Sequence, residues 1–543
     1  MLCASLLFTL LEGSRYIMLG MMAVINSQSV TESVFAEYQV PAYQNYHLLL
    51  LDSGYGTGEL QLSEVQARMQ KLGQENLNPE ISGYGKYSNF LQMNVTDCSV
   101  VQYELATDDN AGPLLRQIAQ IMKKEAAADL VKKITDVSES DRQGKKADKY
   151  LDGALDTIER AKEEAQTEAG SINAEGVRAD SRKVFSKKNA DLVSGGVLHG
   201  QHIQLNIFSK RIIAQDMSGM GNIAQDISGM ENSEPETVQT EISEQEIENP
   251  MEDVKSAKSS PLLAQILTEG DSISAKQIAK EDAVEQRTLH TGNYVQSSSS
   301  GIADKILTVQ YLKKYTSDYR HSISVPHALE YEKEYILFGK YTDEDNLEKM
   351  ASRLLLLREG INFAYLLTDQ AKCEEALAMA AVIAAAAGIP GAVKAIQMGL
   401  LASWAYSESI AELRTLFSGG KISVVKSSDS WTVSLAQTAA VLFDHSVKSR
   451  EVSSGLDYED YLDAFLTLES LDKIGIRFAN LLEKNIRLYA GYEQVKLDCM
   501  ITAMETESSY QAGQMFLSFV TAAPLSKAGY ELKEKYAFSY MEK

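Results

Sequence analysis

The residues that could carry chemistry in this sequence form a few small groups, of which the glycine-rich runs are the most regular. Gly54-x-Gly56-x-Gly58 has Glu59 where a dinucleotide-binding loop has its third glycine. A carboxylate at that place would repel a pyrophosphate, so we predict a glycine turn without a bound cofactor. The run SGGKIS at Ser418–Ser423 also departs from the phosphate-loop pattern, at its first glycine and at its final hydroxyl.

Histidines, cysteines and carboxylates form the second group. His199 and His202 are the closest histidine pair, in HGQH, but no cysteine or acidic residue stands at the spacing of a zinc site. The sequence has no GxSxG motif and suggests no histidine partner for a cysteine. The carboxylates of YEDY at Tyr458–Tyr461 are interpreted as caps or surface groups of a helix at Asp460–Leu471. We therefore expect no catalytic, cofactor-binding or metal-binding residues, and a protein that is not an enzyme.

Composition narrows the class of protein further. A chain of 543 residues is too long for one hydrophobic core and predicts two or three domains. The net charge of -23 argues against nucleic acid and against an anionic lipid surface, because both require a basic face. Four cysteines without a CxxC pair do not make a disulfide framework, and a single disulfide between Cys373 and Cys499 is the less favoured alternative.

The N-terminus carries the strongest signal for location. Met1–Leu11 is uncharged and mostly apolar, and as a helix it would cover roughly 16 Å, about half of a ~30 Å hydrocarbon core. A signal peptide is one interpretation, but a basic start and a clear cleavage site are missing. A span through to Ile25 is another, with Glu12 and Arg15 paired. We favour a third, the end of a longer transmembrane helix that begins upstream, because an anchor ending at Glu12 buries no charge. Residues 1–26 are thus predicted to be a membrane anchor.

The next two regions are predicted to differ in how much folded structure they contain. Residues 27–205 are predicted to form a mixed α+β region. It would hold strands at His47–Leu51 and Leu91–Leu105, and a helical hairpin at Leu114–Val137 and Lys149–Glu168.

Residues 206–300 are predicted to be an acidic linker of low order. Between Glu231 and Glu285 there are 14 acidic residues and 4 lysines, a net charge of -10. Such a segment buries too little apolar area to offset its chain entropy. We expect one short helix in it, near Leu262–Leu267.

Residues 301–543 are predicted to be a helical core domain. Strands are expected at Ala303–Gln310 and Tyr335–Tyr341, followed by a capping box at Thr342–Asp345. A central helix then follows, because its apolar residues keep spacings of three and four: Leu347, Met350, Leu354, Leu357, Ile361 and Ala364.

The stretch after this helix poses a choice between membrane and core. Leu377–Val393 has 17 uncharged residues, roughly 25 Å as a helix and short of a bilayer span. Gly388–Gly391 interrupts it, and Ala395–Ser407 adds only 13 residues. We favour a buried helical hairpin over a second membrane element. Gly419-Gly420 then predicts a β-hairpin from ISVVK and WTVSL. Trp404 and Trp431 are expected in the core.

Several long motifs together resemble one bacterial family, the domain-of-unknown-function family 5702. They are EYILFGKYTDEDNLEKMASRLLLLREGINFAYLLTD, ALAMA, GLLASWAYSES and LFSGGKISVVKSSDSWTVSL, with SVFAEYQVPAYQNYHLLLLDSGYGTGE, LDYEDYLDAFLTL and NIRLYAGYEQVKLD at the two ends of the soluble part. The resemblance implies an N-terminally anchored surface protein of Gram-positive bacteria, associated with tight-adherence pilus systems. It implies no catalytic residues.

The expected fold is helix-rich α+β, with an N-terminal membrane helix. We expect a single-pass protein of the cell membrane whose bulk is extracytoplasmic. It would act as a structural or interaction protein, for example in a tight-adherence-type pilus or surface assembly, with protein partners and no nucleic acid. The alternative is an extracytoplasmic hydrolase or ligand-binding receptor, for which a deep cleft with clustered His, Asp or Glu would speak.

Overall fold

The computed structural model of the protein describes residues 2–78, 80–81, 85–86, 89–137, 250–268, 270–294, 302–517 and 529–541. The chain divides into two compact units, one formed by Met1–Ile121 with Leu205–Lys543 and the other by Met122–Gln204. The contacts given below lie within the first unit. The expected helix at Lys149–Glu168 and the His199–His202 pair fall outside the described residues.

The N-terminal part contributes helices and strands in alternation. Its elements are α1 (Leu2–Phe35), α2 (Val40–Tyr46), β1 (Leu51–Asp52), α3 (Leu62–Leu77), β2 (Glu80–Ile81), β3 (Gly85–Lys86), β4 (Met93–Leu105) and α4 (Asp108–Val137). β4 confirms the strand expected at Leu91–Leu105, and α4 covers the helix expected at Leu114–Val137. Of the strand expected at His47–Leu51, only the last residue belongs to a strand, the short β1.

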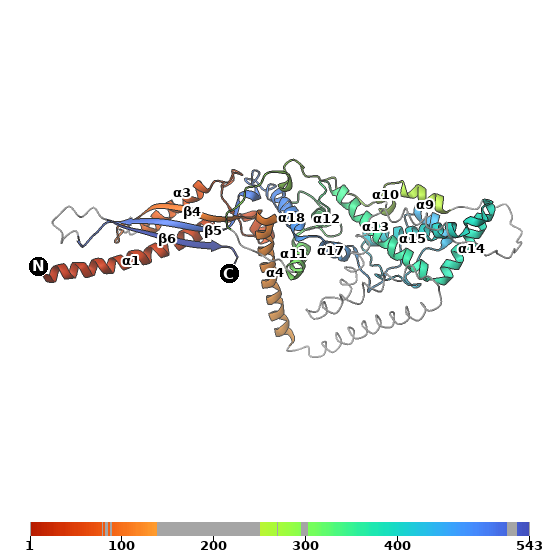
Figure 1. The fold of residues 1–543 in the computed structure, drawn as a ribbon, viewed down its shortest axis with the longest axis horizontal. Coiled ribbons are helices and arrows are strands. Elements are labelled where there is room, and N and C mark those ends of the chain that lie inside the picture. Colours follow the sequence, from red (N-terminus) through yellow and green to blue (C-terminus); the bar gives the residue numbers. More distant parts are fainter. Residues whose placement is uncertain are drawn as a thin grey trace. The chain divides into compact units, whose positions relative to one another are not determined.

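Four strands, from both ends of the sequence, form one antiparallel sheet. β5 (Met500–Ala512) lies in its centre, with β4 on one side and β6 (Tyr530–Ser539) and β1 on the other. Tyr103 pairs with Met504 across β4 and β5, and Met504 with Phe538 across β5 and β6. Figure 1 shows β4, β5 and β6 side by side, with α1 running along them.

α1 covers one face of this sheet with a mixed apolar and polar contact. Phe35 packs on Phe538 with ring centroids 4.7 Å apart. Further along, the hydroxyls of Ser27 and Tyr510 are hydrogen-bonded at 2.8 Å, and those of Thr31 and Thr506 at 3.0 Å. α3 packs on both α1 and β4 and completes the core of this part.

The C-terminal part is mainly helical. It contains α11 (Ile302–Tyr315), α12 (Glu332–Phe338), α13 (Asp343–Thr368), α14 (Gln370–Ala386), η3 (Pro390–Ala392), α15 (Val393–Phe417), η4 (Leu435–Gln437), α16 (Thr438–Phe443), α17 (Tyr458–Leu468), α18 (Leu471–Ile486) and η5 (Leu497–Cys499). α13 confirms the central helix, with the Thr342 side chain accepting a hydrogen bond from the backbone N–H of Asp345. α14 and α15 confirm the helical hairpin, turned at Gly388 with φ +70°.

The hairpin packs through small residues on one side and tryptophans on the other. Ala376, Ala380 and Ala384 are the buried residues of α14, one turn apart, where it meets α15. Trp404 and Trp431 are both buried and lie edge to face, with ring centroids 5.6 Å apart. The described part of the chain has one helix long and apolar enough to cross a membrane, and it is α1.

Three strand predictions in the C-terminal part were wrong. Ala303–Gln310 lies in α11 and Tyr335–Phe338 lies in α12. Helix is favoured there because tertiary contacts override local β propensity: Glu332, Lys333 and Glu334 of α12 are all buried and paired. The β-hairpin expected after Gly420 does not form either. In its place Ile422 makes a single antiparallel bridge with Leu456.

The predicted linker was wrong over its C-terminal half. α9 (Pro250–Lys258), α10 (Leu262–Ile266) and η2 (Val284–Gln286) lie in it, and α10 confirms the one short helix expected there. α9 and α10 pack on α15, and Arg287 forms an ion pair with Glu483 of α18. Their composition predicted low order, because they have too few apolar residues to form a core alone. They fold by packing on the core of the C-terminal helices. Residues 138–249 lie outside the described ones.

Candidate functional site

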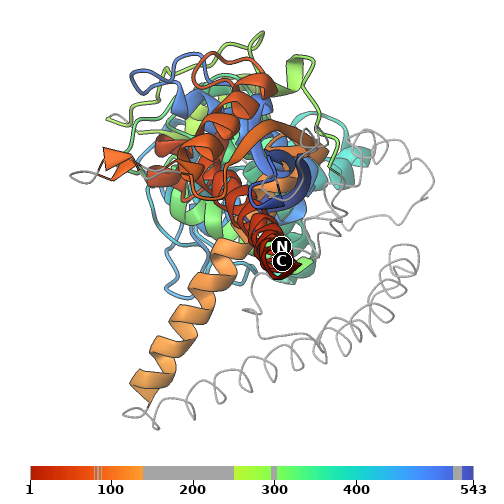
Figure 2. The same cartoon turned by 90° about the vertical axis from the view of Figure 1, so that its left-hand side faces the viewer.

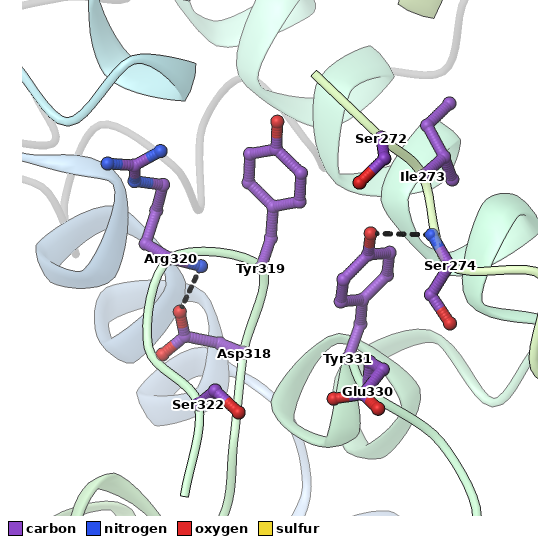
Figure 3. A pocket seen from close by; sticks show the side chains of 9 residues that line it. All are labelled: Ser272, Ile273, Ser274, Asp318, Tyr319, Arg320, Ser322, Glu330 and Tyr331. Atoms are coloured by element: carbon purple, nitrogen blue, oxygen red, sulfur yellow. Dashed lines mark hydrogen bonds between the residues drawn. The ribbon is translucent and has the colours of Figure 1, made fainter. Parts of the chain in front are cut away.

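A small cavity in the C-terminal part is one candidate for a ligand site. Its volume is ≈ 300 Å³, and it is lined by Ser272, Ile273, Ser274, Asp318, Tyr319, Arg320, Ser322, Glu330 and Tyr331. Three segments bring these residues together: the extended chain after α10, the turn after α11 and the residues that lead into α12 (Figure 3). The backbone N–H of Ser274 donates to the Tyr331 hydroxyl at 2.9 Å and joins two of the segments.

The turn that forms one wall is shaped by its own aspartate. Asp318 Oδ1 accepts hydrogen bonds from the backbone N–H groups of Arg320 and His321, at 2.7 and 2.8 Å. This Asx-type arrangement is a common way to hold a tight turn. The other oxygen of Asp318 pairs with the buried ammonium of Lys333 at 2.7 Å. The carboxylate is therefore committed to the fold on both sides.

A layer of buried charge lies next to this turn. Glu334 accepts hydrogen bonds from the Tyr458 hydroxyl at 2.6 Å and from the backbone N–H of Tyr319 at 3.0 Å. Burial and the nearby charge of Asp318 raise the pKa of Glu334 to about 8. Burial likewise raises the pKa of Asp463 to about 6, although Lys333 and Lys313 counteract it. Glu334 is thus protonated at neutral pH, whereas Asp463 is mostly ionised there.

The serines that line the cavity have no histidine beside them in the lining. Ser274 is the lining serine with a carboxylate partner, and its hydroxyl donates to Asp343 at 2.6 Å. Asp343 also accepts the backbone N–H groups of Glu330 and Tyr331, so it organises the chain before α13. No histidine is among the lining residues. Since two backbone N–H groups also donate to the Asp343 carboxylate, we assign the Ser274–Asp343 pair a structural role, and the lining suits a polar ligand.

His290, Asp498 and Cys499 form a second group, which sequence reasoning missed. The Nδ1 atom of His290 lies 3.0 Å from Asp498 Oδ2 and 4.0 Å from Cys499 Sγ. Because both neighbours face the same ring nitrogen, the three cannot act as a nucleophile–base–acid relay. The histidine and the cysteine are 209 positions apart, so no spacing in the sequence could have indicated the pair.

This group also fits a metal ion poorly. Its ligand atoms lie within 4.8 Å of one another. However, Asp498 already forms an ion pair with Arg287 at 2.5 Å, and that guanidinium would repel a cation. Burial, with the charge of Asp498, raises the pKa of Cys499 to about 12, which keeps the thiol protonated. We therefore assign the group a structural role between η5 and the segment before α11.

The glycine runs and carboxylates singled out in the sequence are structural. Asp52 accepts hydrogen bonds from the N–H groups of Gly54 and Gly56, so its carboxylate occupies the place a phosphate would need. Gly419, with φ +91°, ends α15. Asp460 forms a capping box with Asp457 at the start of α17, which confirms its capping role. All four cysteines are free, so Cys373 and Cys499 form no disulfide.

α1 is the third candidate, as a membrane or partner helix. Glu12 and Arg15 pair at 2.7 Å and are buried by protein. Glu12 Oε2 accepts the backbone N–H groups of Met515 and Phe516, and Arg15 Nη1 donates to the carbonyl of Gly513. The charges expected to interrupt the anchor thus fasten α1 to the end of β5. Figure 2 views the molecule from the side of the α1 N-terminus.

Comparison with known proteins gives one match. Residues 240–512 match the family of unknown function DUF5702. No curated protein and no solved structure matches the chain. The matched range includes α9 to α18 and all of β5, and therefore most of the motifs that carry the resemblance. Since the match spans half of the sequence, the chain belongs to the family of unknown function DUF5702.

Proposed function

We propose that this protein is a single-pass membrane protein whose folded part lies outside the cytoplasm, where it has a structural or interaction role and no enzymatic one. The observation that carries the proposal is the apolar helix α1, with the Glu12–Arg15 pair at the point where the sheet begins to cover it. Residues 2–11 precede this pair and carry no charge. Leu6, Leu7 and Leu10 expose 56% or more of their surface to solvent.

The residues around the Glu12–Arg15 pair suit a membrane surface. Phe90 is 65% exposed, and Leu91 and Phe516 are partly exposed beside it in the chain segments that contact Arg15 and Glu12. Exposed apolar side chains such as Phe and Leu enter the boundary between the headgroups and the acyl chains. We propose that the bilayer ends at this level, so that β4, β5 and β6 stand outside it.

A retained anchor accounts for α1 better than a removed signal sequence does. Both alternatives agree with the length and composition of the helix. However, Leu19, Ala23, Val30 and Val34 on its inner face belong to the core under the sheet. Removal of α1 would expose that core to water, at a cost of ~1.5–3 kcal/mol for each large apolar side chain that loses its cover.

Protein partners are proposed because the described residues form no recognised catalytic site. A role in a surface or tight-adherence-type pilus assembly is supported by the resemblance of the motifs and by the anchored helix. The described carboxylates and histidines that come together are engaged in holding turns, caps and ion pairs. We therefore propose that the protein works by contact with other proteins of its assembly.

Membrane fractionation of the full-length protein tests the proposal. We expect the protein in the membrane fraction after a carbonate wash, and in intact cells we expect added protease to digest its folded part. The double variant Leu7→Arg/Leu10→Arg should move it to the soluble fraction. Val425→Arg, at a side chain that is 66% exposed in the C-terminal part, is the matched control and should not. Wild-type protein in the cytosol would refute the proposal.

A ligand-binding receptor is the second candidate, and the cavity of ≈ 300 Å³ is the observation that favours it. Its lining of serines, tyrosines and paired charges suits a small polar molecule. Isothermal titration with a panel of monosaccharides and amino acids distinguishes the two. Saturable binding that Tyr319→Ala abolishes would favour the receptor. A titration without heat of binding would favour the purely structural role.

A further inference from the structure

The outer face of α1 stays apolar beyond the residues that the membrane would cover. Past Arg15, five large apolar side chains of the helix point away from the sheet and expose about half or more of their surface: Ile17 66%, Met18 48%, Met21 61%, Val24 50% and Ile25 57%. No charged residue lies between Arg15 and Glu32. A helix that merely shields a sheet from water has a polar outer face, so this surface is built for contact.

Two of these exposed residues, together with Leu10, follow a seven-residue repeat. Leu10, Ile17 and Val24 stand seven positions apart, and Leu6, Gly13 and Gly20 stand four positions before each of them. The resulting alternation of four and three is the pattern by which one helix packs along another over several turns. At 100° per residue this seam lies on the side of α1 opposite to Glu12 and Arg15.

The two glycines of the seam leave room for a second backbone. A Cβ atom added at Gly13 or Gly20 would meet nothing within 4 Å, so neither glycine is required by the packing of the chain itself. Glycine in a helix interior costs ~1 kcal/mol relative to alanine. Small residues at such spacing allow the axes of two helices to approach closely.

We propose that this seam binds the same seam of a second copy of the protein, with the two α1 helices parallel and in register. Several features point to a second copy. The seam carries no charge, so two copies with a net charge of -23 each can meet there without opposing charges. A helix with the same repeat fits it, and anchoring in one membrane would hold two copies in the same direction.

The seam also has a defined end. After Ile25 the outer surface of α1 turns polar, in a shallow hollow of ≈ 470 Å³ lined by Ile25, Gln28, Ser29, Glu32, Ser33 and Ala36. The Glu32 carboxylate accepts hydrogen bonds from Gln28 and from the Tyr536 hydroxyl, so it belongs to the fold of one copy. The contact thus extends from the membrane to about Val24. The inference rests on the proposed function for the common direction of the two copies, and it goes beyond that function because the seam continues outside the bilayer from Gly13 to Val24.

Cysteine cross-linking of the full-length protein in membranes tests the contact and its register. Cys3 is replaced by serine, and Ile17→Cys or Val24→Cys is added in that background. We expect each variant to form a disulfide-linked dimer on mild oxidation. Lys533→Cys, on the outer face of β6, is the matched control, and Cys3→Ser alone reports any contribution of the three remaining cysteines. Equal cross-linking at Lys533→Cys and at the seam, or cross-links to a protein of another size, would overturn the proposal.

Gly20→Leu separates association from folding. Leucine has the better helix propensity, and a Cβ atom at this position meets nothing within 4 Å in the same copy, so the melting temperature should stay the same or rise. The dimer should nevertheless weaken at least tenfold, measured as mass by light scattering in a mild detergent. Met18→Leu, on the same helix outside the seam, should leave the dimer unchanged. A monomeric wild type in detergent that also fails to cross-link in membranes would refute the seam while leaving membrane location intact.

Discussion

Arg358 of α13 and Glu412 of α15 face each other through two hydrogen bonds, Nε to Oε2 at 2.8 Å and Nη2 to Oε1 at 2.7 Å, and neither side chain is more than 2% exposed. Lys426 joins the pair by bonding both Glu412 and Glu408 at 2.6 Å. Burial alone would raise the pKa of Glu412, but Arg358 and Lys426 hold it at about 2. The network contains two positive and two negative groups and stays neutral as a whole.

Breaking this pair on one side should destabilise the C-terminal part strongly. Arg358→Met leaves Glu412 buried with one cation fewer, and we expect a loss of ~3–5 kcal/mol in the free energy of unfolding. Arg358→Met/Glu412→Met should recover part of that loss, because the remaining Lys426–Glu408 pair is neutral. Chemical unfolding monitored by Trp404 and Trp431 fluorescence measures both.

The control for this prediction is an exposed pair. Lys473 and Glu469 lie one turn apart at 3.1 Å, and the lysine side chain is 58% exposed. Lys473→Met should change the free energy of unfolding by less than ~1 kcal/mol. A similar small effect for Arg358→Met would contradict the role given to the buried network.

The raised pKa of Glu334 predicts a pH dependence of stability. The folded state keeps a proton up to about pH 8, whereas the unfolded chain releases it near the ordinary value of 4.5. Between these values the folded state binds more protons, so the free energy of unfolding falls as pH rises, by up to ~1.4 kcal/mol per pH unit. Glu334→Gln mimics the protonated form and should remove this slope. Melting temperatures of both proteins at pH 5, 6, 7 and 8, taken as a difference, provide the measurement, and parallel curves would speak against it.

The bonds from Glu12 to the end of β5 predict slow amide exchange. The N–H groups of Met515 and Phe516 donate to Glu12 Oε2 at 3.1 and 2.6 Å. Glu12→Gln weakens these charge-assisted bonds, and we expect exchange at both amides to accelerate ~10–100-fold. Hydrogen exchange with mass spectrometry measures it. Glu32→Gln on the same helix, which bonds Tyr536, should leave the two amides unaffected.

The cysteines should differ in reactivity by burial. Cys3 is exposed, Cys373 is half-buried, and Cys98 and Cys499 are buried. Burial also raises the pKa of Cys98. We expect a maleimide to modify Cys3 first in detergent solution, Cys373 more slowly, and Cys98 and Cys499 only after unfolding. Fewer than four modified thiols in the unfolded, unreduced protein would reveal a disulfide that the structure lacks.

The sequence was sufficient to predict a helix where the apolar spacing and the end signals lie within the helix itself. α13 and the α14–α15 hairpin follow from apolar spacing, a Thr342 cap and the break at Gly388. The strand β5 could not be found in this way. Its face toward α1 carries Thr506, Ser508 and Tyr510, whose hydroxyls bond to other segments, so it lacks the apolar alternation that marks a half-buried strand.

The candidate sites were beyond sequence reasoning for a related reason. Their residues come from segments that are far apart in the sequence and meet only through tertiary contacts. Ser274, Asp318 and Tyr331 meet at the cavity through turns and a backbone-to-tyrosine bond. Glu332, Lys333 and Glu334 at the start of α12 have the charges of a solvent-exposed segment. In the structure they are buried, and Lys333 pairs with Asp318 and Glu459. Only the partners, which lie elsewhere in the chain, distinguish the two interpretations.

The sheet that joins the two ends of the sequence sets the order of events during synthesis. β4 ends at Leu105, whereas its partner β5 begins at Met500. A ribosome adding about 5–20 residues per second needs roughly 20–80 s to make the intervening chain. During that time α1 and β4 are already outside the ribosome, but β5 and β6, which complete their core, have not yet been made. A protein with this topology must therefore be shielded from aggregation while it is being translated, and its sheet is complete only when its last strand, β6, has been made.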